Sequence, residues 1–79
     1  MSIETKLARA MSELDESGVL VLQDPEIGAG WIERSEGGWW SITAENGDGV
    51  YRTRPVSRRD EIENEIRSWL KCQEQLDSL

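Results

Sequence analysis

The sequence contains no histidine, one cysteine, no phenylalanine and only two prolines. Without histidine, the chain lacks the side chain that most often acts as a general base near neutral pH. A single cysteine, Cys72, excludes an intramolecular disulfide and a zinc site built from four Cys or His ligands. No stretch approaches the roughly 20 apolar residues of a membrane-spanning helix. From these absences we expect no bound metal, no cofactor and no membrane span.

Patterns typical of enzymes are also missing, so we predict no catalytic residues and no enzyme activity. Cys72 has no histidine to activate it and falls near the edge of an apolar stripe, which favours a spectator thiol. The glycines between residues 28 and 38 are not followed by the Gly-Lys-Ser/Thr of a phosphate-binding loop. Carboxylate pairs such as Glu61 and Glu65 are expected in any chain this acidic.

The 79 residues, with a mass of 9.0 kDa, predict one domain that spans residues 1–79. A core of this size supplies only about 3–5 kcal/mol of net stability, so association with another chain is one way to gain more. The first ten residues include Glu4, Lys6 and Arg9 and lack the apolar core of a signal peptide. We therefore expect a cytoplasmic protein.

Two segments carry apolar residues at helical spacing. Residues 2–17 contain a thin apolar stripe, with Ser2 as a predicted N-cap and Gly18 as a predicted stop. Residues 57–77 contain a longer stripe, and Ser57 with Asp60 forms a variant of the capping box. The stripe of this second helix consists of Ile62, Ile66, Trp69, Leu70, Gln73 and Leu76.

Between the helices, short apolar runs separated by turn signals predict strands at residues 19–22, 31–36, 39–45 and 50–54. The first run is apolar throughout, which favours a strand that is central or buried on both faces. Gly37-Gly38 predicts a tight turn, and Asn46 to Gly49 is the strongest turn signal in the chain. The order α-β-β-β-β-α predicts an α+β fold, a four-stranded antiparallel β-meander flanked by an N-terminal and a C-terminal α-helix.

Adjacent tryptophans raise the question of which aromatic side chains are exposed. Trp40 falls on the apolar face of the third predicted strand, and this places Trp39 on the opposite, mostly polar face. Trp39 then packs beside a long neighbour such as Arg52 or Arg54, is covered by the loop around Ile27, or is an exposed anchor for a partner. Trp31 raises the same question with less force, because Ile32 competes with it for the core face.

Charge is distributed unevenly along the chain. Residues 1–49 hold three Lys+Arg against ten Asp+Glu, whereas residues 50–79 hold six of each. Residues 50–59 contain no acid and four arginines: Arg52, Arg54, Arg58 and Arg59. One interpretation is that these arginines pair with Glu33, Glu36, Glu45, Asp60 or Glu61. The other is a small basic patch that faces an anion, a nucleic acid or an acidic partner.

The excess of acid, which gives a net charge of −7, is the larger signal. It is either a solvated surface that maintains solubility or a surface that attracts a basic region of another protein. Direct binding to nucleic acid is disfavoured, because the overall field repels phosphate. The residues that we predict to bind a partner are Glu26, Glu33, Glu36, Trp39, Glu45, Asp48, Arg52 and Arg54.

In length, acidity and lack of catalytic residues, the chain is similar to small inhibitors encoded by phages and mobile elements, including anti-CRISPR proteins. This likeness is one of size and composition. The sequence therefore favours a small non-enzymatic protein-binding module that blocks a basic, nucleic-acid-handling surface of a larger protein. A second hypothesis is a homodimeric regulatory or accessory subunit that associates through the C-terminal helix. A third, distant hypothesis is a βββα nucleic-acid-binding module that uses Arg52 to Arg59.

Overall fold

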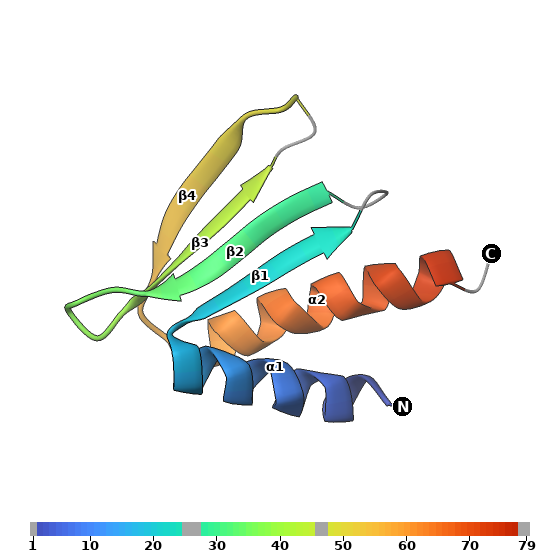
Figure 1. The fold of residues 1–79 in the computed structure, drawn as a ribbon, viewed down its shortest axis with the longest axis horizontal. Coiled ribbons are helices and arrows are strands. Elements are labelled where there is room, and N and C mark those ends of the chain that lie inside the picture. Colours follow the sequence, from blue (N-terminus) through green and yellow to red (C-terminus); the bar gives the residue numbers. More distant parts are fainter. Residues whose placement is uncertain (1, 25–27, 46–47, 78–79) are drawn as a thin grey trace.

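The computed structural model describes residues 2–24, 28–45 and 48–77. The elements in chain order are α1 (Ile3–Ser17), β1 (Val19–Asp24), β2 (Gly28–Arg34), β3 (Trp40–Glu45), β4 (Tyr51–Val56) and α2 (Arg59–Asp77). The strands form one antiparallel sheet in the order β1-β2-β3-β4, and both helices lie against the same face of it (Figure 1). This arrangement confirms the predicted α+β meander with two flanking helices.

The ends of α1 follow the local signals in the sequence. The hydroxyl of Ser2 accepts a hydrogen bond from the amide of Thr5 at 3.2 Å and so satisfies one of the free N–H groups of the first turn. Gly18 adopts a φ of 78°, which glycine reaches without steric cost, and its amide donates to the Leu14 carbonyl.

The start of α2 differs from the prediction. The helix begins at Arg59 and not at Ser57, so the predicted start is early. Asp60, the expected partner of Ser57 in a capping box, instead accepts two hydrogen bonds from the guanidinium group of Arg58, at 3.1 and 2.8 Å. A bidentate guanidinium–carboxylate pair is charge-assisted, and it occupies both oxygens of the acid at this helix start.

The core fills the space between the sheet and the two helices. Its fully buried side chains are Leu14, Ile32, Ile62 and Ile66, and they are joined by Leu7, Met11, Leu20, Ile42 and Val56. Trp40 packs against the margin of this cluster, as expected from its apolar strand face. The buried residues of the two helices belong to the predicted stripes, so the amphipathic pattern of each helix sets the face that it turns to the sheet.

β1 is an edge strand, and the prediction of a central or doubly buried strand is wrong. It pairs with β2 alone, and only one of its two faces is covered. Leu20 is in the core, whereas the side chains of Val19 and Val21 are 38% and 60% exposed. The apolar run at residues 19–22 does not indicate burial on both faces, because Val19 and Val21 point to the face of the sheet that the helices do not cover.

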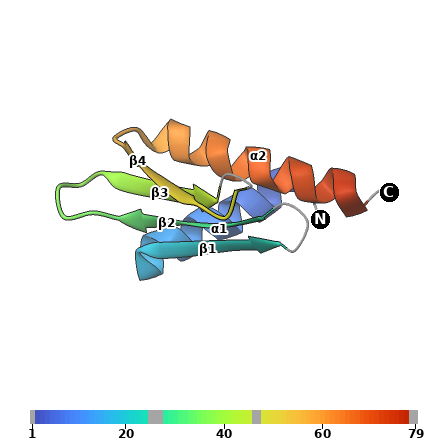
Figure 2. The same cartoon turned by 90° about the horizontal axis from the view of Figure 1, so that it is seen from above.

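The helical layer and the sheet diverge along the molecule. They meet where β4 leads into α2, and they separate toward the last turns of α2 (Figure 1). α2 runs along the side of β3 and β4, while α1 lies behind β1 and β2 (Figure 2). The start of α1 and the end of α2 lie at the same end of the helical layer (Figure 1).

Candidate functional site

The face of the sheet away from the helices is covered by no described element. Strand alternation and the register of the three strand pairs place every second strand residue on it. We call this surface the open face. Its residues are Val19, Val21, Gln23, Ala29, Trp31, Glu33, Ser41, Thr43, Glu45, Tyr51, Thr53 and Pro55.

An aromatic pair occupies the centre of the open face. The ring centroids of Trp31 and Tyr51 lie 5.5 Å apart, with an angle of 44° between the ring planes. Since Trp31 is on β2 and Tyr51 on β4, the rings meet above β3, the strand between them. Tyr51 is nevertheless 49% exposed, so the pair presents aromatic surface to solvent on a sheet that fixes its position.

Two threonines support the aromatic pair. The hydroxyl groups of Thr43 and Thr53 form a hydrogen bond of 2.8 Å across β3 and β4. Thr43 lies directly opposite Trp31 in the β2–β3 register and is only 4% exposed, although no described helix covers this side. Its large neighbours on the face shield it from water, and its polar group is satisfied within the sheet.

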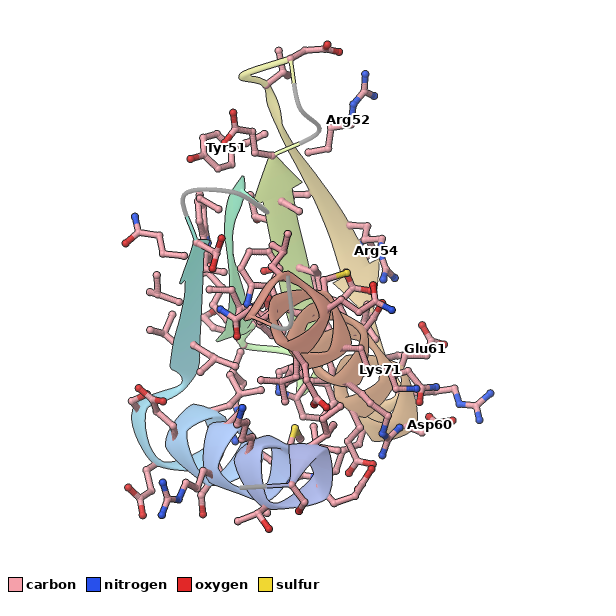
Figure 3. The ribbon with its side chains drawn as sticks, turned by 90° about the vertical axis from the view of Figure 1, so that its right-hand side faces the viewer. Tyr51, Arg52, Arg54, Asp60, Glu61 and Lys71 are labelled. Carbon is pink, nitrogen blue, oxygen red and sulfur yellow. The ribbon has the colours of Figure 1, made fainter. Side chains whose placement is uncertain are left out.

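Glu33 and Glu45 are the only charged side chains among the open-face residues, and both are acidic. The strand arginines occupy the alternate positions and point to the other side of the sheet. Figure 3 shows Tyr51 on the opposite side of β4 from Arg52 and Arg54. The open face is therefore apolar at its centre and negative at its margin.

Five arginines of the described chain form ion pairs on the helical side of the molecule. Their ion pairs, measured from guanidinium nitrogen to carboxylate oxygen, are Arg34–Asp15 (3.5 Å), Arg54–Glu65 (3.0 Å), Arg58–Asp60 (2.8 Å), Arg59–Asp15 (2.8 Å), Arg59–Glu63 (3.8 Å) and Arg67–Glu4 (3.1 Å). Capture by Asp60 is confirmed for Arg58, but the predicted pairing with Glu33, Glu36 or Glu45 is wrong. Those three acids form no ion pair within the described ranges.

Asp15 joins three elements on the helical side. Its carboxylate accepts two hydrogen bonds from Arg59, at 3.0 and 2.8 Å, and also attracts Arg34. The hydrogen bonds from Arg59 hold the pKa of Asp15 below its ordinary value of 3.8, against a smaller opposing effect of desolvation. The same contact raises the pKa of Arg59. This cluster ties the end of α1 to the start of α2 and has the geometry of a structural ion pair.

Trp39 lies immediately before β3, at one end of the open face, and is 39% exposed. Packing beside Arg52 or Arg54, one of the predicted environments, is wrong, because both arginines point to the other face of the sheet. Ile27, whose loop is another predicted cover for Trp39, lies outside the described residues. Trp39 instead lies next to Gly37 in the turn, where an added Cβ would be 2.8 Å from its Nε1 atom. Its exposed part lies beside the turn between β2 and β3, and the row of Glu33, Ser41 and Pro55 separates it from Trp31 in the register.

The other predicted partner-binding residues are spread over several parts of the molecule. Glu36 is exposed in the turn between β2 and β3, and Asp48 is exposed in the connection between β3 and β4. Arg52 and Arg54 lie on the covered side of the sheet, where Arg54 pairs with Glu65. Glu26 lies outside the described residues.

The sequence-based set of site residues omits Trp31, Tyr51 and Val21, which form the apolar centre of the open face. The alternation of side chains along each strand predicts that Trp31 lies on this face. Once Ile32 is assigned to the core, Trp31 must point the other way, and the register then sets it beside Tyr51. Two of the predicted residues, Glu33 and Glu45, share this face with the aromatic pair.

A concave surface lies between the sheet and the C-terminal half of α2. It has a volume of about 140 Å³, and Leu22, Gly30, Ala44, Ser68, Trp69 and Cys72 are among the residues that line it. We call it the α2 groove. The lining is mainly apolar, and Cys72 is an exposed free thiol. Pockets for small-molecule ligands usually measure about 300–1,000 Å³, so this groove suits a single side chain better.

Within the described ranges 2–24, 28–45 and 48–77, no group of three or more His, Cys, Asp or Glu residues could hold a metal ion. In the part of the chain that the structure describes, no helix has the length and apolar character needed to cross a membrane. Comparison with protein-family models, with curated proteins and with solved structures found no match. The open face and the α2 groove are the two surfaces whose chemistry bears on function.

Proposed function

We propose that the protein is a small, acidic, non-enzymatic module that binds another protein through the open face. The observation that supports this most strongly is the Trp31–Tyr51 pair, in which Tyr51 is 49% exposed, on a sheet face whose charged residues in the described chain are both acids. Aromatic side chains dominate the energetics of protein interfaces. Acids at the margin favour a partner with a basic surface, because they speed encounter and disfavour partners of like charge.

We infer that this module acts as an inhibitor. A basic surface on a protein that handles nucleic acid is built to hold phosphate, and an acidic protein that covers it excludes the nucleic acid. Direct binding of this chain to nucleic acid is disfavoured by its net charge of −7 and by the engagement of Arg54, Arg58 and Arg59 in ion pairs with its own acids.

A second candidate function is a homodimeric regulatory or accessory subunit that associates through α2. The observation that favours it is the α2 groove, which is lined by the half-buried Trp69 and the exposed Cys72. Leu76, farther along α2, is also only half-buried. An apolar side chain from a second copy of α2 has a volume suited to this groove.

Charge reversal on two surfaces distinguishes these functions. One double variant carries Glu33→Lys and Glu45→Lys on the open face, and the control carries Glu13→Lys and Glu16→Lys on α1, on the other side of the sheet. Immobilised wild type and variants are exposed to a lysate of the source organism, and retained proteins are quantified by mass spectrometry at salt concentrations from about 0.05 to 0.5 M.

We expect the proteins retained by the wild type to be lost from the open-face variant and kept by the α1 control. Retention should fall as salt rises, because exposed charge pairs are screened over about 8–10 Å. Retention that survives both the open-face reversal and high salt would refute binding through the open face. If such binding is instead lost in Leu76→Ser, the α2 surface is the interface.

A further inference from the structure

Three side chains of the open face converge around one position. Glu45 lies directly opposite Tyr51 in the β3–β4 register, and Trp31 is opposite Thr43, the next residue of β3 on the same face. Directly opposite residues have Cβ atoms about 4.5–5.5 Å apart, and diagonal neighbours about 7–8 Å apart remain within reach of aromatic side chains. The register therefore places Glu45 next to Tyr51 and diagonal to Trp31, whose ring centroids are 5.5 Å apart.

We propose that this position binds an arginine side chain of the partner, with the guanidinium stacked on the Trp31–Tyr51 pair and hydrogen-bonded to the Glu45 carboxylate. This inference rests on the proposed function and specifies the partner's chemistry at the same face. We call the three residues the arginine seat.

The chemistry of the guanidinium group fits all three side chains. It is flat, weakly hydrated and permanently charged, so it stacks on aromatic rings and is attracted by their π-electrons. Its N–H groups also match the two oxygens of a carboxylate. A lysine ammonium satisfies the charge but is compact and strongly hydrated, so it gains less from the rings. A neutral urea group of the same shape gains neither the attraction to the rings nor the charge-assisted hydrogen bonds.

The seat is preorganised and is not used by the chain's own cations. Thr43 beneath the rings is held by its hydrogen bond to Thr53, so the platform needs little ordering on binding. Arg54 is held by Glu65 on the far side of the sheet, and Arg52 also points to that side. No lysine or arginine is present among the open-face residues of the described chain, so an arginine has to come from a partner.

Three capped peptides test the inference with a defined probe. One contains arginines separated by glycines, the second has lysine at the same positions, and the third has citrulline, the neutral analogue of arginine. Each is titrated into the isotopically labelled protein, and the indole N–H of Trp31 and the amides of Thr43, Glu45 and Tyr51 are followed by NMR. We expect saturable shifts at these groups, with the arginine peptide at least about fivefold tighter than the lysine peptide. The citrulline peptide should give no saturable shift.

Two variants assign the contacts. Glu45→Gln keeps the shape of the side chain and removes its charge, and it should weaken the arginine peptide about tenfold. Trp31→Leu keeps an apolar residue and should weaken the peptide about fivefold. Glu13→Gln on α1 is the matched control and should leave the affinity unchanged. Trp31→Leu exposes Thr43 to water and can unfold the protein. In that case the affinity of Glu45→Gln for the arginine peptide is the test of the arginine seat.

The failures of the inference and of the proposed function are distinguishable. Equal affinity of the arginine and citrulline peptides, or shifts confined to the helices, would overturn the arginine seat. Loss of partner capture in the Glu33→Lys/Glu45→Lys variant would then still support binding through the open face. If this double variant captures the same proteins as the wild type, the proposed function is refuted, whichever peptide binds.

Discussion

At Gly30 the backbone of the neighbouring strand β3 leaves no space for a side chain. A Cβ added there would lie 2.5 Å from the carbonyl oxygen of Thr43 and 3.2 Å from the Cα of Ala44. Both are backbone atoms, so neither can rotate away as the end of a side chain would. Gly30 also lines the α2 groove, and its lack of a side chain lets β2 and β3 approach each other there.

We expect Gly30→Ala to lower the free energy of unfolding by about 1–3 kcal/mol, the usual cost of forcing an extra carbon into a packed site. Thermal melting should report this as a decrease of about 4–8 °C for each kcal/mol. Gly18→Ala is the comparison, because Gly18 has open space around it and only its positive φ opposes a side chain, at a cost of about 1 kcal/mol. A Gly30→Ala protein that melts at the wild-type temperature would contradict the close approach.

Asp15 should make stability depend on pH in the acid range. Its pKa in the folded protein is lowered, chiefly by hydrogen bonds from Arg59, so its contribution is fully present above its ordinary pKa of 3.8. The contribution is lost as the pH falls through the lower, folded-state pKa, because protonation then removes the ion pair. Melting curves of wild type and Asp15→Asn should therefore differ at neutral pH and converge in strong acid. A difference that stays constant down to strong acid would argue against this role.

At the scale of elements, α2 has two halves with different roles. Ile62 and Ile66, in its first turns, are fully buried between the sheet and α1. Farther along, Trp69 and Leu76 are only half-buried, and Cys72 is exposed beside the α2 groove. The first half anchors the helix to the core, and the second half carries apolar surface that the sheet does not cover.

Shortening a side chain in each half of α2 should lower the free energy of unfolding by different amounts. Ile66→Ala leaves a cavity in the core and should cost about 2–5 kcal/mol, whereas Leu76→Ala should cost less than about 1 kcal/mol. Chemical denaturation followed by circular dichroism measures both. A large loss in Leu76→Ala that shrinks as the protein is diluted would show that Leu76 is buried in a dimer, because dilution dissociates the wild-type dimer too, and would favour the second candidate function.

The elements that the sequence predicts well are those with local signals. Ser2 and Gly18 bound α1 through groups within a few residues, and the Ile62–Ile66 spacing orients α2 without knowledge of the rest of the fold. The edge position of β1 has no local signal, because an apolar run looks the same whether its second face meets a helix or water. Its assignment needs the strand order, which is a property of the whole chain.

The site was less predictable for a related reason. Glu33 and Glu45 were candidates from charge alone, but their isolation from the arginines depends on the register, which puts Arg52 and Arg54 on the other face. The Trp31–Tyr51 contact joins strands that are not adjacent in the sheet, so no short stretch of sequence contains it.

At the scale of the whole molecule, the two sides of the sheet differ in charge as well as in cover. The ion pairs between arginines and acids are on the helical side, while the open face combines apolar rings with Glu33 and Glu45, which form no ion pair within the described residues. Two copies that met open face to open face would bring these acids together. Like charges therefore oppose self-association, and the same charges favour a basic partner.

This asymmetry predicts opposite salt effects on two kinds of association. At low salt the protein should be a monomer of 9.0 kDa, and high salt should allow weak self-association through the apolar centre of the open face. Binding to a basic partner should weaken over the same range. Size-exclusion chromatography with light scattering measures the first effect, and Val21→Lys should abolish it while Leu76→Ser should not. A dimer that persists at low salt would contradict the prediction.

The shared location of the two ends of the described chain determines how the protein can be handled. The start of α1 and the end of α2 both lie at one end of the helical layer, away from the open face (Figure 1). A fluorescent protein or a surface tether fused at either end leaves the Trp31–Tyr51 side unobstructed. The two attachment points still differ, because a fusion after α2 adjoins the α2 groove and one before α1 does not. Fusions at the two ends should therefore bind a ligand of the open face equally well. A ligand of the α2 groove should bind less well when the fusion follows α2.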